Sequence, residues 1–127
     1  IKTGRDVTIV AIGKMVSKAI NVSNILKEYN IDAEVINCRY LKPFDNYGVI
    51  KSINKTNNVV TLEDGTCIGG LASTLKELLV DCNKSNIKFK SYCYPDKFIE
   101  HGSVDELEDK YGFNVEDIVE YIRESVK

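Results

Sequence analysis

The fold is decided by the stretch Val7-Thr8-Ile9-Val10-Ala11-Ile12-Gly13, a run of mostly β-branched apolar residues that a glycine ends. A short continuous apolar run is typical of a strand that is buried on both faces of a parallel sheet. Apolar residues then recur at helical spacing from Met15 to Leu26, and this helix is predicted to end near Asn30, which tolerates left-handed geometry. Ala33 to Cys38 predicts a second strand. A strand, a helix and a strand in this order indicate parallel pairing.

The same alternation continues along the chain. After the break at Lys42-Pro43-Phe44, Asp45 is predicted to cap a short helix. A third strand is predicted at Val59 to Leu62, with Glu63-Asp64-Gly65 turning the chain out of it, and a fourth at Ile87 to Tyr94. The helix between these two strands follows Gly69-Gly70, and its apolar face consists of Leu71, Leu75, Leu78, Leu79 and Cys82.

Two further helices are predicted after the fourth strand. Ser103 with Glu106 has the capping-box spacing, and Gly112 ends that short helix. Asn114 is predicted to cap the last helix, which has acids in its first turn and an apolar stripe. The whole pattern predicts one α/β domain over residues 1–127, built as a three-layer α/β/α sandwich.

Composition excludes several classes of function. The 127 residues suit a single domain, and a net charge of −2 argues against nucleic acid as the main partner. No apolar run approaches the roughly 18 residues that span a bilayer, and no signal-peptide pattern is present. Since the chain begins at Ile1 rather than Met, we expect it to be a fragment of a longer polypeptide.

The cysteines indicate a reducing compartment. They are far apart in sequence and form no CxxC pair: Cys38, Cys67, Cys82 and Cys93. A small secreted disulfide scaffold would be denser in cysteine, and a zinc site would have paired ligands. We therefore predict four reduced thiols, mostly packed as small hydrophobes.

The loop from Glu63 to Gly70 is the first candidate for chemistry. Its notable residues are Glu63, Asp64, Gly69 and Gly70. A glycine-rich helix start after a strand can cradle an anion, but neither GxxxxGK nor GxGxxG is present. The glycines fit a tight turn and a close approach of helix to sheet equally well, and we favour that structural interpretation. A free-standing anion-binding module stays open as an alternative.

Other candidate residues give weaker signals. Asp64 occupies the position of a phospho-accepting aspartate in a receiver domain, but the acids such a domain needs after its first strand are missing. His101 is the only histidine and has Asp96 and Glu100 nearby. Without a nucleophile or a second base in a recognisable arrangement, we assign Asp96 and His101 to structure or to an interface. No catalytic, cofactor-binding or metal-ligating residue is predicted.

Three segments in order resemble the C-terminal domain of the transketolase-like, thiamine-diphosphate-dependent enzymes. They are Asp6 to Gly13, Asn37 to Asp45, and Leu62 to Gly65 with Gly69-Gly70. The segment Pro95-Asp96-Lys97-Phe98-Ile99-Glu100-His101-Gly102-Ser103 is similar to the one typical of the 1-deoxy-D-xylulose-5-phosphate synthase family. It argues against the sister families, the transketolases and the 2-oxo-acid dehydrogenase β subunits. Two departures are conservative: Glu63-Asp64 stands where two Glu are usual, and Phe44 where Leu often follows Lys-Pro.

The resemblance implies the remaining expectations. The family fold is a mostly parallel, mixed sheet of about five strands with one antiparallel strand, so a fifth strand is expected near Ile1 to Thr3 or Phe98. The parent enzyme would condense pyruvate with D-glyceraldehyde 3-phosphate and release carbon dioxide, feeding isoprenoid, thiamine and pyridoxal phosphate synthesis. Thiamine diphosphate and Mg²⁺ would be bound by upstream domains outside this chain. This domain would pack against them, support a homodimer and be inactive alone, in a bacterial cytoplasm or in the plastid or apicoplast of a plastid-bearing eukaryote.

Overall fold

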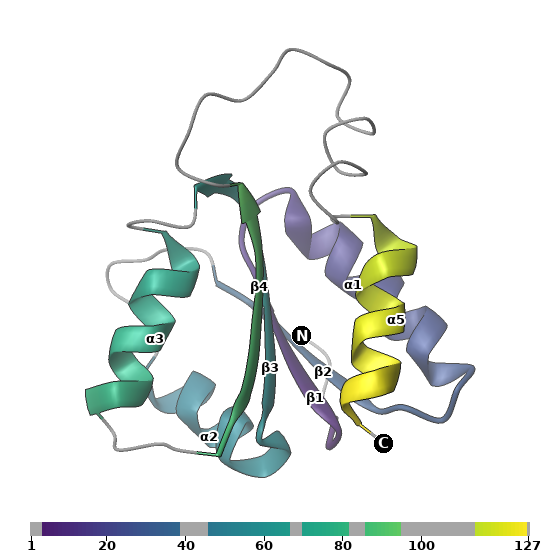
Figure 1. Cartoon of the computed structure of the whole chain (residues 1–127), viewed down its shortest axis with the longest axis horizontal. Coiled ribbons are helices and arrows are strands. Elements are labelled where there is room, and N and C mark those ends of the chain that lie inside the picture. The colour runs from purple at the N-terminus through teal and green to yellow at the C-terminus, as the bar shows by residue number, and fades with distance from the viewer. Residues whose placement is uncertain (1–3, 39–45, 67–69, 82–85, 95–113, 127) are drawn as a thin grey trace.

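A computed structural model describes residues 4–38, 46–66, 70–81, 86–94 and 114–126. Strands alternate with helices, as the sequence predicted (Figure 1). In chain order the elements are β1 (Val7–Ala11), α1 (Met15–Lys27), β2 (Ala33–Asn37), α2 (Asn46–Thr56), β3 (Asn58–Thr66), α3 (Leu71–Asp81), β4 (Lys88–Tyr94) and α5 (Val115–Ser125).

The sheet has the strand order β2-β1-β3-β4, and every pair is parallel. Ile9 at the centre of β1 lies opposite Val35 of β2 and Val60 of β3. The expectation of about five strands with one antiparallel is therefore corrected, for the described part of the chain, to four parallel strands. The fifth strand came from the resemblance and not from a local pattern, and the places proposed for it lie outside the described residues.

Helices cover both faces of the sheet, which confirms the three-layer sandwich. Helices α1 and α5 lie on one face, and α2 and α3 on the other (Figure 1). Since alternate side chains of a strand point to opposite faces, Val7 and Ile9 pack in the core with α1 and α5, whereas Val10 packs with α2 and α3. Strand β1 is buried along its whole length, which explains its continuous apolar sequence.

The predicted ends of two helices are confirmed. The Asn114 side chain accepts a hydrogen bond from the backbone N–H of Asp117 at 2.8 Å, so it caps α5. After α1, Asn30 adopts a left-handed φ of 61°, and the N–H of Ile31 donates to the carbonyl of Leu26 at 3.0 Å. The proposed cap at Asp45 and the short helix from Ser103 to Gly112 lie outside the described residues.

The predicted turn at Glu63-Asp64-Gly65 is wrong, because β3 continues through all three residues to Thr66. The pairing with β4 shifts on the way: Leu62 lies opposite Tyr92, and Thr66 lies opposite Tyr94. The longer path of β3 between these pairs marks a bulge or a similar irregularity. Glycine and acidic residues favour turns, but glycine inside a strand also marks a bulge, and the sequence alone did not separate the two.

The cysteine prediction is partly wrong. Cys38 is a buried thiol, as expected, but Cys93 of β4 is disulfide-bonded to a partner outside the described residues. A disulfide requires Cα atoms roughly 4.4–6.8 Å apart, and separation along the sequence does not report that distance. Among the described helices, none combines the length and the apolar character that crossing a membrane requires.

Candidate functional site

Two of the predicted site residues, Glu63 and Gly70, lie at the carboxyl edge of the sheet, where β3 leads into α3. Glu63 lies in the last part of β3, and its side chain is only 4% exposed. One carboxylate oxygen, Oε2, accepts a hydrogen bond from the backbone N–H of Leu71 at 2.5 Å, and the N–H of Ala72 also donates to this carboxylate. Leu71 is the first residue of α3. Glu63 therefore joins the end of the strand to the start of the helix.

This contact replaces an ordinary helix cap. The residue before α3 is Gly70, which has no side chain to accept the first N–H groups of the helix. Its carbonyl accepts the backbone N–H of Thr74 at 3.1 Å, the first bond of the helical ladder. The missing cap is supplied by Glu63, seven positions earlier, and the partial positive charge of the helix N-terminus favours its carboxylate.

The electrostatic environment of Glu63 opposes ionisation despite these bonds. Burial raises the pKa of its carboxyl above the usual 4.5, and the hydrogen bonds from Leu71 and Ala72 offset only part of that increase. Within the described residues, the second oxygen, Oε1, has no hydrogen-bond partner. Both oxygens that could act chemically are buried, and the one with partners holds a helix in place. The arrangement fits a structural anchor better than a general acid or base.

The structure describes only part of the predicted set. It brings Glu63 and Gly70 together at the start of α3. The backbone of Asp64 lies in β3, but its side chain is outside the described part. Gly69, Asp96 and His101 also lie outside it. The assignment of all six predicted residues to a structural motif or an interface stays a prediction.

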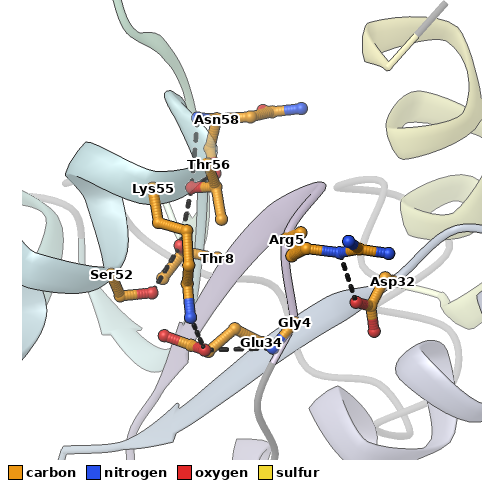
Figure 2. A network of polar contacts seen from close by, with 9 residues as sticks. All are labelled: Gly4, Arg5, Thr8, Asp32, Glu34, Ser52, Lys55, Thr56 and Asn58. Atoms are coloured by element: carbon orange, nitrogen blue, oxygen red, sulfur yellow. Dashed lines mark hydrogen bonds and ion pairs between the residues drawn. The ribbon is translucent and has the colours of Figure 1, made fainter.

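A second polar cluster, which sequence reasoning missed, surrounds the beginning of the sheet (Figure 2). The Thr8 hydroxyl of β1 lies 2.7 Å from the hydroxyls of both Ser52 and Thr56 of α2. These bonds fix α2 against a strand that is otherwise apolar. A threonine in a β-branched run was the only sequence signal, and it is also an ordinary strand residue.

Glu34 of β2 belongs to the same cluster. It accepts hydrogen bonds from the Nζ of Lys55 at 2.6 Å and from the backbone N–H of Gly4 at 3.0 Å (Figure 2). Burial by itself would raise the pKa of Glu34, but the bonds from Lys55, Ser52 and Gly4 outweigh it and lower that pKa below 4.5. A side chain at Gly4 would meet the backbone, since an added Cβ would lie 2.4 Å from the carbonyl carbon of Ala33.

An apolar groove of about 510 Å³ runs beside β4, the strand at one end of the described sheet. It is lined by Leu79 and Val80 of α3 and Phe89 of β4, together with the polar residues Lys76, Lys90 and Ser91. Val80 is 73% exposed. The Nζ of Lys76 lies 5.4 Å from the centre of the Phe89 ring. No group of three His, Cys, Asp or Glu side chains that could hold a metal ion occurs among the described residues.

Comparison with known proteins gives one family. The sequence profile described as "Transketolase, C-terminal domain" matches residues 1–118. The 1-deoxy-D-xylulose-5-phosphate synthase of Pelotomaculum thermopropionicum is 36% identical over 98% of this chain, and that of Dictyoglomus turgidum is 42% identical over 96%. The chain spans 20% of the length of each.

A solved structure agrees with this match. A chain described as "Split gene transketolase, inactive beta4 tetramer" superimposes with a TM-score of 0.86 at 34% identity, covering 98% of this chain and 40% of its own. The parallel sheet described above is thus found in a relative whose sequence is also related.

Proposed function

Because the chain belongs to the transketolase C-terminal domain family, we propose that it is the C-terminal domain of a 1-deoxy-D-xylulose-5-phosphate synthase. The observation that carries the proposal is the identity of 36–42% to proteins of that name over nearly the whole chain. Since the chain spans a fifth of their length, the activity belongs to a longer polypeptide. That polypeptide would condense pyruvate with D-glyceraldehyde 3-phosphate and release carbon dioxide, in the cytoplasm of a bacterium.

Thiamine diphosphate and Mg²⁺ belong to the proposal as cofactors of the parent enzyme. Magnesium prefers oxygen ligands, usually carboxylates and phosphate oxygens. The described residues do not fit such a site, since they include no group of three side chains able to hold a metal and the groove beside β4 is apolar and flanked by lysines. We therefore place both cofactors on domains outside this chain and derive no chemical step here.

We assign this domain the role of architecture. The buried bond between Glu63 and Leu71 gives the carboxyl edge a fixed shape. The groove with exposed Val80 offers an apolar surface, of the kind that usually marks a contact with another protein surface. Upstream domains of the same polypeptide are the partner we propose for it, within a homodimer.

A transketolase is the second candidate, because the solved relative at 34% identity is described as one. The segment from Phe98 to Ser103 argues against it, as it does against a 2-oxo-acid dehydrogenase β subunit, but it lies outside the described residues. An assay of the full-length polypeptide separates the candidates. A synthase forms 1-deoxy-D-xylulose 5-phosphate from pyruvate and glyceraldehyde 3-phosphate, whereas a transketolase transfers a two-carbon unit between sugar phosphates.

The architectural role has its own test. The isolated 127-residue chain should show no thiamine diphosphate binding by calorimetry. Tight binding would contradict the proposal that other domains of the polypeptide bind the cofactors. In the full-length polypeptide, His101→Ala is expected to lower dimerisation or stability more than the turnover of assembled enzyme. A loss of turnover with an unchanged dimer would instead give His101 a chemical role.

A further inference from the structure

Cys93 of β4 is disulfide-bonded, and the positions of the described elements restrict its partner. The chain contains four cysteines, of which Cys38 is a free thiol. Two candidates remain within the chain, Cys67 and Cys82. Both lie outside the described residues, but each directly follows a described element in the sequence. Cys67 follows the last residue of β3, and Cys82 follows the last residue of α3.

The end of α3 lies far from Cys93. Leu79 and Val80 belong to the last turn of α3 and share a groove with Phe89, the second residue of β4 (Figure 1). Cys93 stands four residues beyond Phe89 on the strand, which is about 13 Å at roughly 3.3 Å per residue. A disulfide joins Cα atoms roughly 4.4–6.8 Å apart. A cysteine that directly follows α3, as Cys82 does, is therefore out of reach.

The end of β3, by contrast, lies beside Cys93. Thr66 is the last residue of β3 and pairs with Tyr94, the neighbour of Cys93 in the sequence. Paired strands are about 4.8 Å apart, and consecutive Cα atoms about 3.8 Å. A cysteine that directly follows Thr66 can therefore meet the distance limit. Cys67 occupies that position in the sequence.

A bond between these two cysteines would act on the start of α3. Cys93 is 8% exposed and belongs to the core on the side of α1 and α5. Cys67 stands four positions before Leu71, the first residue of α3, whose backbone N–H donates to Glu63. A disulfide would tie the connection between β3 and α3 to the core. Once it opens, the hydrogen bond to Glu63 has to hold the start of α3 without that covalent link.

The cellular compartment gives this bond a meaning beyond stability. Glutathione and thioredoxin keep cytosolic thiols reduced, and the disulfides found there are usually transient, catalytic or redox-sensing. We propose that Cys67 and Cys93 form a reversible disulfide, which glutathione opens and whose closure fixes the start of α3. Its redox role rests on the proposed function, because the cytoplasmic location comes from there. The pairing of the two cysteines does not.

The exchange balances with glutathione as the reductant. One glutathione thiolate attacks a sulfur of the pair, forms a mixed disulfide and releases the other cysteine. A second glutathione thiolate attacks the glutathione sulfur of that mixed disulfide and releases the first cysteine. Two glutathione molecules thus become oxidised glutathione, and the two cysteines take up two electrons and two protons as thiols. An excess of oxidised glutathione reverses both steps.

Peptide mapping of the wild-type chain, purified without reductant, tests the pairing. Trypsin cleaves after lysine and arginine, so it places Cys67 in the peptide 56–76, Cys82 in 77–84 and Cys93 in 91–97. Mass spectrometry should find 91–97 linked to 56–76, and the link should disappear after reduction. A link to 77–84, or an unlinked 91–97, would overturn the proposal.

A glutathione titration with alkylation of free thiols tests reversibility. We expect the pair to open in about 5 mM reduced with about 0.05 mM oxidised glutathione, a cytosolic poise, and to close again in a tenfold excess of the oxidised form. A pair that stays closed at the cytosolic poise would be a structural staple, since such disulfides resist the glutathione pool. That result overturns the redox role. No step uses a substrate, so a failed synthase assay and a failed redox response are separate results.

Hydrogen exchange measures the effect on α3. The backbone amides of Leu71 and Ala72 should exchange at least about tenfold faster in the reduced chain, because the covalent link no longer opposes local opening. Cys67→Ser should show the faster exchange in both glutathione buffers. Cys82→Ser is the matched control and should keep the difference between the buffers. Equal exchange in the oxidised and reduced wild type, or a lost difference in Cys82→Ser, would overturn the proposal.

Discussion

Replacing Glu63 with alanine should destabilise the domain through one defined contact. The substitution leaves the backbone N–H groups of Leu71 and Ala72 without their acceptor at the start of α3. Loss of a helix cap costs about 0.5–2 kcal/mol, and the space left by a buried side chain adds to that cost. Relief of the buried charge offsets a part, so we expect the free energy of unfolding to fall by about 2–3 kcal/mol at neutral pH. For a chain of this size the melting temperature should fall by roughly 10 °C.

Two further variants make the measurement specific. Glu63→Gln keeps the shape and one acceptor oxygen, so its loss should be no more than about 1 kcal/mol. Glu77→Ala removes the same residue type from an exposed position of α3 and should change stability little. Urea unfolding followed by circular dichroism gives all three values. The reasoning is refuted if Glu63→Ala costs no more than Glu77→Ala.

The pH dependence of the same variants tests the electrostatics of Glu63. Its folded-state pKa is raised, so the stability that its carboxyl contributes is fully present below about pH 4.5 and is lost as the pH rises through the folded pKa. The wild type should therefore lose stability relative to Glu63→Gln as the pH increases over that window. If the difference in the free energy of unfolding between the two proteins stays constant with pH, burial does not govern the ionisation of Glu63.

Three other predictions concern the second polar cluster and a helix end. Glu34 has a lowered pKa, so the stability that its carboxylate contributes is present above pH 4.5 and is lost as the pH falls through the folded pKa. The wild type should therefore lose stability relative to Glu34→Gln in acid. A difference in the free energy of unfolding between the two proteins that stays constant from about pH 3 to about pH 6 would contradict this. Gly4→Ala should cost about 1–3 kcal/mol, because its Cβ would lie 2.4 Å from the backbone of Ala33, and an unchanged melting temperature would show that the chain end moves aside. Asn114→Ala should cost about 1 kcal/mol by losing the bond to the N–H of Asp117, whereas Asn114→Ser should recover most of it in the same denaturation assay.

Much of the fold was predictable because its signals are local. The apolar run of β1 is buried on both faces, and Asn114 sits at a helix start with acids in the next turn. The predictions that failed concern features that depend on contacts between separate parts of the chain. The register shift that carries β3 past Glu63 depends on its pairing with β4, and the disulfide at Cys93 depends on where a second cysteine lies in space.

The polar residues of the candidate sites show the same difference between local and non-local signals. Glu63 was chosen for its place beside glycines at the end of a strand, and the structure gives it a definite contact with Leu71. No local pattern could show that the Asn58 side chain is buried and donates to Ser125, since that contact joins β3 to the far end of the chain.

The central claim is that this chain is the C-terminal domain of a synthase, and a graft tests it most directly. These 127 residues would replace the matching region of the Dictyoglomus turgidum synthase, to which they are 42% identical. The measurement is the formation of 1-deoxy-D-xylulose 5-phosphate from ¹³C-labelled pyruvate and glyceraldehyde 3-phosphate. The account predicts a dimeric chimera that forms this product, and a weaker dimer in the same chimera carrying Glu63→Ala. A folded chimera without synthase activity, measured beside an active graft of the matching Pelotomaculum thermopropionicum region, would contradict it.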